Sequence, residues 1–130
     1  MKFRSDFVTN SSSSSFIISM TNDDIHKAVI YAVEKATDNM DTDEGNTLYT
    51  MKEVEDYIVE RYGYSDTTLE EAINNRPYVN KIYIIMKTAI QNNKAIICKE
   101  VGYDANAFVE FLEYLQKFDP SVEVVNTDEI

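Results

Sequence analysis

A run of serines near the start of the chain is the first group of residues that could do chemistry. Successive backbone N–H groups and hydroxyls, with positive charge nearby, are the parts of an anion-binding loop for a phosphate group or a nucleotide. The residues that would form it are Lys2, Arg4, Asn10, Ser11, Ser12, Ser13 and Ser14. A solvated loop is the simpler interpretation of the run, and a processing or docking signal is a further alternative that the sequence leaves open. Because serine has no apolar area to bury, we expect the run to be at least partly exposed.

The other reactive side chains form no catalytic or metal-binding motif. His26 is the single histidine, and no motif supplies it with a nucleophile, so we expect a surface or helix-packing role. Cys98 lies in an apolar stretch, where a thiol is buried and unreactive. The acidic stretch 38–46 lacks the ligand spacing of a calcium-binding EF-hand loop. We therefore assign no catalytic residue, no metal ligand and no cofactor, and we favour a protein that is not an enzyme.

Tyrosines combined with acidic residues point to a different kind of site. The chain has nine tyrosines and no tryptophan, and several tyrosines cluster around an acidic helix. Tyrosine joins apolar area to a hydroxyl and is enriched at protein interfaces. The interface candidates are Tyr57, Tyr62, Tyr64, Asp56 and Glu60. Core packing of the tyrosines and a solvated acidic surface are the simpler alternatives.

Charge and length limit the kinds of partner. The net charge of −11 opposes direct binding to nucleic acid and to acidic membrane surfaces, and no local basic cluster offsets it. No apolar run is long enough to span a membrane, and no apolar signal core follows the first residues, so we expect a cytoplasmic protein. A chain of 130 residues fits one domain, residues 1–130, in which 1–14 could be a semi-independent segment. The oligomeric state stays open.

Periodicity and capping residues predict the elements that must position these side chains. We expect strands at 2–8, 15–20, 95–101 and 121–126, and helices at 22–38, 51–62, 68–74, 77–92 and 105–118. Residues 82–86 are β-branched enough to form a strand instead. The strand, helix and strand after residue 94 predict a βαβ unit with two parallel strands. The expected fold is α/β, with a small three- to four-stranded sheet, at least partly parallel, covered by about five helices.

The N-terminal residues carry one resemblance. Residues 2–17, which include Phe7-Val8-Thr9-Asn10 and the serine run up to Phe16, resemble an N-terminal phrase of uncharacterised small proteins from low-GC Gram-positive bacteria and their phages. The resemblance ends at residue 17, and no family is recognised beyond it. It implies a bacterial or phage source and leaves a shared processing or targeting step open, but it implies no activity.

These observations lead to two hypotheses of function. The first is a non-enzymatic binding or regulatory module that engages a basic surface of a partner protein. The alternative is a phosphate- or nucleotide-binding α/β domain, or an enzyme, that uses the Ser11–Ser15 loop.

Overall fold

The computed structural model describes residues 13–36, 46–64, 66–102 and 106–130. Within them the chain forms, in order, β1 (Ser13–Thr21), α1 (Asp24–Lys35), β2 (Asn46–Leu48), α2 (Met51–Tyr62), α3 (Leu69–Asn74), α4 (Pro77–Gln91), β3 (Lys94–Gly102), α5 (Asn106–Phe118) and β4 (Glu123–Asn126). A short 3₁₀ turn, Thr127–Glu129, follows β4. The predicted strand 2–8 lies outside the described residues. No helix in the described ranges is both long and apolar enough to cross a membrane.

The sheet is antiparallel, and this corrects the predicted parallel pairing. Its strand order is β2-β3-β1-β4, and each neighbouring pair runs in opposite directions. β3 and β4 both run opposite to β1 and so point the same way, as a strand–helix–strand unit requires. They are not neighbours, however, because β1 lies between them. The spacing of β3, α5 and β4 depends only on neighbouring residues of the chain. The strand that lies between β3 and β4 is β1, which comes from the other end of the chain.

The connections form two interlocked units. β1, α1 and β2 make one strand–helix–strand unit that is split by β3, and β3, α5 and β4 make a second one that is split by β1. This is the order of the ferredoxin-like split βαβ topology. Here the three helices α2, α3 and α4 are inserted between β2 and β3, where that topology has a direct connection. β2 itself was not predicted, because three residues are too few to show a period of two.

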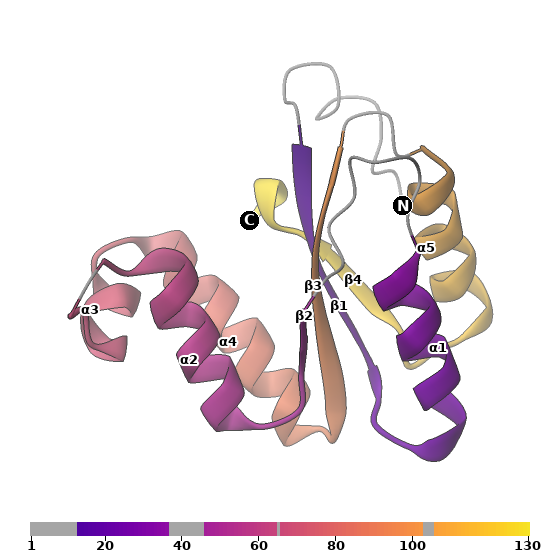
Figure 1. Ribbon diagram of the computed structural model, residues 1–130, viewed down its shortest axis with the longest axis horizontal. Helices are drawn as coiled ribbons and strands as arrows, with labels where there is room; N and C mark the ends of the chain where they lie inside the picture. Colours follow the sequence, from indigo (N-terminus) through magenta and orange to yellow (C-terminus); the bar gives the residue numbers. More distant parts are fainter. Residues whose placement is uncertain (1–12, 37–45, 65, 103–105) are drawn as a thin grey trace.

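The two faces of the sheet support two separate cores. Along β1 the side chains alternate, so that Phe16, Ile18 and Met20 face α1 and α5 while Ile17 faces the inserted helices. Figure 1 shows α1 and α5 on one side of the sheet and α2, α3 and α4 on the other. The sheet is thus a shared central layer between two helical layers.

Local signals place the inserted helices where the sequence predicts them. Thr50 and Thr68 each form a capping box with the glutamate three residues later, which begins α2 and α3. Residues 82–86 are helical and do not form a strand. Pro77 begins α4, and the apolar residues of α4 lie on one buried face of the helix. The buried residues of that face are Val79, Ile82, Met86 and Ala89.

Part of the serine run belongs to the sheet. Residues 13–15 lie in β1 and pair with 100–102 of β3, so the run is not wholly a loop. The side chain of Ser14 is buried on the face that carries α1 and α5, and its Oγ has no hydrogen-bond partner among the described residues. The expectation of an exposed run is therefore wrong for Ser14, because the strand extends further toward the N-terminus than its apolar residues indicate.

Candidate functional site

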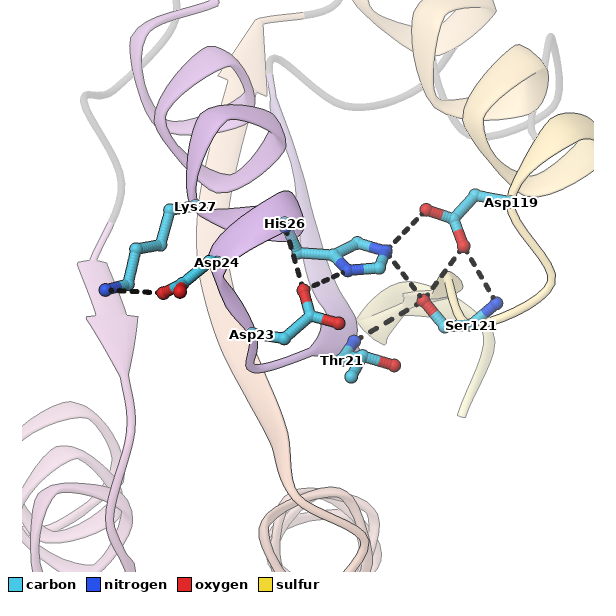
Figure 2. Close-up of polar contacts among 7 residues, drawn as sticks. All are labelled: Thr21, Asp23, Asp24, His26, Lys27, Asp119 and Ser121. Carbon is cyan, nitrogen blue, oxygen red and sulfur yellow. Dashed lines mark hydrogen bonds and ion pairs between the residues drawn. The ribbon is translucent and has the colours of Figure 1, made fainter.

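Three polar side chains surround the imidazole of His26, one from the same helix start and two from near the C-terminal end of the chain. Figure 2 shows Asp23 and His26 at the start of α1 beside Asp119 and Ser121 in the turn that follows α5. The ring atoms Nδ1 and Nε2 of His26 lie 2.6 Å from Asp23 Oδ1 and 2.7 Å from Asp119 Oδ2. Ser121 Oγ lies 3.3 Å from Nε2 and donates to Asp119 Oδ1 at 2.9 Å. We call these four residues the histidine clamp.

The electrostatics of the histidine clamp favour the imidazolium form. The hydrogen bond to Asp23, and next the bond to Asp119, raise the pKa of His26 even though burial opposes them. The hydrogen bond from His26 lowers the pKa of Asp23. Burial alone would raise the pKa of Asp119, but hydrogen bonds from Ser121 and His26 lower it overall. The clamp is therefore an imidazolium held between two carboxylates.

This arrangement has the connectivity of a catalytic triad but not its chemistry. A general base must accept the serine proton at Nε2. Here Asp119 occupies Nε2, and the hydroxyl of Ser121 donates to the same carboxylate. The clamp instead joins the beginning of α1 to the turn before β4, and the backbone N–H of Thr21 adds a bond to Ser121 Oγ at 3.4 Å. This agrees with the packing role expected for His26.

A cleft of about 670 Å³ lies between α2 and the sheet. The N-terminal part of β1, the end of β3, β2 and the final turn form one side of it, and α2 forms the other. The α2 side chains that line it are Glu53, Asp56, Tyr57, Glu60, Arg61 and Tyr62. The sheet contributes Ile17, Leu48, Cys98 and Glu100, among others. We call this space the acidic cleft.

The carboxylates of the acidic cleft differ in how far they are already engaged. Glu53 closes the capping box of α2 and accepts the backbone N–H groups of Tyr49 and Thr50. Asp56 accepts a bond from Lys52 Nζ at 3.1 Å on the exposed surface. Glu60 forms no ion pair or hydrogen bond with any residue in the described ranges. Glu60 is thus the carboxylate most available to a ligand.

Two neutral polar groups lie among the apolar side chains that line the cleft. They are the hydroxyl of Tyr57 and the thiol of Cys98, which lie near each other. Burial raises the pKa of the Cys98 thiol to about 12, and burial also raises the pKa of Tyr57 above its ordinary value. Both groups therefore stay protonated near neutral pH. Cys98 is a buried core residue, as expected, and it supplies no thiolate nucleophile here.

The structure brings together most of the predicted interface residues. Asp56, Tyr57, Glu60 and Tyr62 line the acidic cleft, while Tyr64 lies beyond the end of α2 and is exposed. The candidates for the anion-binding loop are distributed differently. Ser13 and Ser14 lie in β1, and the other five lie outside the described residues: Lys2, Arg4, Asn10, Ser11 and Ser12.

Several residues of both sites were missed by the sequence reasoning. Asp119 and Ser121 are far from His26 along the chain, and no spacing rule connects them. Arg61 and Glu100 form an ion pair of 3.8 Å that joins α2 to β3. Arg61 follows Tyr57 by four residues and so lies on the same side of α2. This spacing predicts that Arg61 belongs to the same site as Tyr57.

The chain matches no protein-family model, no curated protein and no solved structure. Among the residues described, no group of three or more His, Cys, Asp or Glu side chains is placed to hold a metal ion. Any statement of function therefore depends on the geometry of the cleft itself.

Proposed function

We propose that this protein is a cytoplasmic, non-enzymatic binding module whose acidic cleft holds a basic segment of a partner protein. The observation that carries the proposal is the position of Asp56, Tyr57 and Glu60 along the wall of a cleft of about 670 Å³. These residues come from one helix, and their spacing directs them to one side of it. Arg61 and Lys99 also line the cleft, but Arg61 is paired with Glu100 and Lys99 donates to the backbone carbonyl of Glu34. The remaining carboxylates, together with apolar side chains such as Ile17, suit a long basic side chain.

Such a side chain has two parts that match the cleft. The methylene stem of lysine or arginine packs against apolar surface while its charged end stays near polar groups. Ile17, Leu48 and Cys98 supply that surface, and Glu60 supplies a carboxylate without a described partner. The net charge of −11 would also speed the approach of a basic partner. Neither His26 nor Cys98 is prepared to remove a proton, which favours binding over catalysis.

The test is binding of a short fluorescent peptide in which lysine alternates with alanine and valine, followed by fluorescence anisotropy. We expect Glu60→Gln to weaken binding by up to about fivefold, because one exposed charge pair contributes about 0.2–1 kcal/mol. Asp56→Asn combined with Glu60→Gln should weaken it further. Binding should also decrease as the salt concentration rises.

Glu110→Gln is the matched control. Glu110 is exposed on α5, in the opposite helical layer, so this variant loses the same charge without touching the cleft. We expect it to bind the peptide almost as well as the unmodified protein. Equal weakening by Glu60→Gln and Glu110→Gln would mean that the peptide responds to net charge alone, and the cleft would lose its proposed role.

A further inference from the structure

Two arginines and three tyrosines form a connected group at one end of the inserted helices. Arg76 Nη1 donates to the hydroxyl of Tyr78 at 2.9 Å, and Tyr64 lies close enough to interact electrostatically with the same guanidinium. The rings of Tyr78 and Tyr62 meet edge to face with their centres 5.9 Å apart. Tyr62 follows Arg61 at the end of α2, and the two side chains interact electrostatically. We call Arg61, Tyr62, Tyr64, Arg76 and Tyr78 the arginine–tyrosine patch.

The patch concentrates positive charge in an acidic protein. The chain has three arginines, and the two that lie in the described residues both belong to it. Tyr64 is 75% exposed and Tyr78 39% exposed, so the patch faces solvent. Arg76 forms no ion pair with the part of the chain that is described. Tyrosine and arginine are the residue types that most often dominate binding energy at protein interfaces.

The patch is continuous with the acidic cleft. Arg61 and Tyr62 line the cleft and also belong to the patch, because both lie at the end of α2. A chain segment that leaves the cleft past this end would pass from carboxylates to guanidinium groups. Arg61 is already paired with Glu100, whereas the planar guanidinium of Arg76, held by the hydroxyl of Tyr78, is suited to binding a carboxylate with two hydrogen bonds.

We propose that the arginine–tyrosine patch binds a carboxylate side chain that flanks the basic stretch of the same partner segment, with Arg76 as the main donor. This inference rests on the proposed function of the cleft and adds the partner's charge pattern to it. A basic stretch next to an acidic residue would also fix the direction in which the segment lies, because Arg76 lies outside the cleft that Asp56 and Glu60 line.

The experiment compares three fluorescent peptides with the same lysine-containing stretch. One ends in two glutamines, one carries two glutamates after the stretch, and one carries two glutamates before it. Added glutamates should weaken binding to a protein of charge −11 unless a local contact compensates. We expect one of the two glutamate peptides to bind about fivefold more tightly than the glutamine peptide.

Two variants in the patch and one control variant outside it assign that gain to the patch. Arg76→Gln should remove it and leave binding of the glutamine peptide intact, whereas Lys87→Gln, later in α4, loses the same charge and should preserve it. Tyr78→Phe removes the hydroxyl that positions Arg76 and should reduce the gain.

The outcomes separate the two proposals. If the glutamine peptide binds with the Glu60 dependence described above but glutamates bring no gain, or the gain survives Arg76→Gln, the patch proposal is wrong and the cleft proposal stands. If the glutamine peptide shows no Glu60 dependence, the cleft proposal is wrong and the patch proposal is lost with it.

Discussion

Both ring nitrogens of His26 are engaged by carboxylates, at 2.6 Å to Asp23 and 2.7 Å to Asp119, so its charge state is coupled to the docking of α1. The pKa of His26 is raised above 6.5, and those of Asp23 and Asp119 are lowered below 3.8. The stabilisation from His26 is complete below pH 6.5 and is lost as the pH rises through its raised value. The stabilisation from the two aspartates is complete above pH 3.8 and is lost as the pH falls through their lowered values.

We therefore expect His26→Gln to lower the free energy of unfolding more at mildly acidic pH than at alkaline pH. Urea unfolding of both proteins at pH 5.5 and at pH 9, about one unit or more outside the unperturbed histidine value, measures the difference. Equal destabilisation at the two pH values would show that the charge of the imidazole contributes nothing and that His26 acts through packing alone.

For single residues, the sequence predicts contacts between side chains that are close along the chain but not between side chains that are far apart along it. Asp56, Tyr57 and Glu60 could be assigned to one site because helical spacing places them on one side of α2. Asp23 could be placed near His26 for the same reason. Asp119 could not, because its position beside the ring depends on how the end of α5 packs against the beginning of α1.

The wall of the acidic cleft depends on the first turn of one helix. Thr50 Oγ1 accepts the backbone N–H of Glu53 at 3.2 Å, and the Glu53 carboxylate accepts the backbone N–H of Thr50 at 3.1 Å. These bonds satisfy groups that would otherwise lack partners at the beginning of α2. The cap thus fixes the helix that carries Asp56, Tyr57 and Glu60.

Thr50→Ala removes one half of this capping box. We expect the free energy of unfolding to fall by about 1 kcal/mol, measured by urea denaturation. Thr88→Ala is the control, because Thr88 is exposed within α4 and alanine favours a helix interior, so its effect should be near zero or slightly stabilising. A Thr50→Ala protein as stable as the unmodified one would contradict a role for the cap.

Elements were predictable where their signals are local. The bounds of α2 and α4 agree with capping residues, a proline and a glycine that lie in the helices or next to them. A Cβ at Gly63 would lie 2.7 Å from the carbonyl oxygen of Val59, which explains why glycine ends α2. Strand pairing was not predictable in the same way, because β1 inserts between β3 and β4 from far along the chain.

The whole molecule has two cores that share one sheet. Ile82 of α4 and Leu112 of α5 are both fully buried, on opposite faces. β1 and β3 contribute side chains to both cores. Loss of one core therefore exposes one face of the sheet that supports the other core. The two helical layers are therefore expected to unfold together.

Ile82→Ala and Leu112→Ala test this coupling. We expect each to lower the free energy of unfolding by about 2–5 kcal/mol, because each leaves a cavity in a buried core. Each variant should still show a single transition when circular dichroism and tyrosine fluorescence are followed together. A second transition in either variant would mean that the inserted helices unfold separately from the sheet.

The insertion of α2, α3 and α4 also has a consequence for the order of folding. Residues 49–95 separate Leu48 from its pairing partner Ile96, so β2 can reach β3 only by closing a long loop, and each doubling of loop length adds about 0.6 kcal/mol of entropy loss. The contacts among the three inserted helices are local and can form early. Once they are packed, the ends of the insertion are held near each other. Packing of the inserted helices therefore lowers the entropy cost of pairing the edge strand β2 with β3.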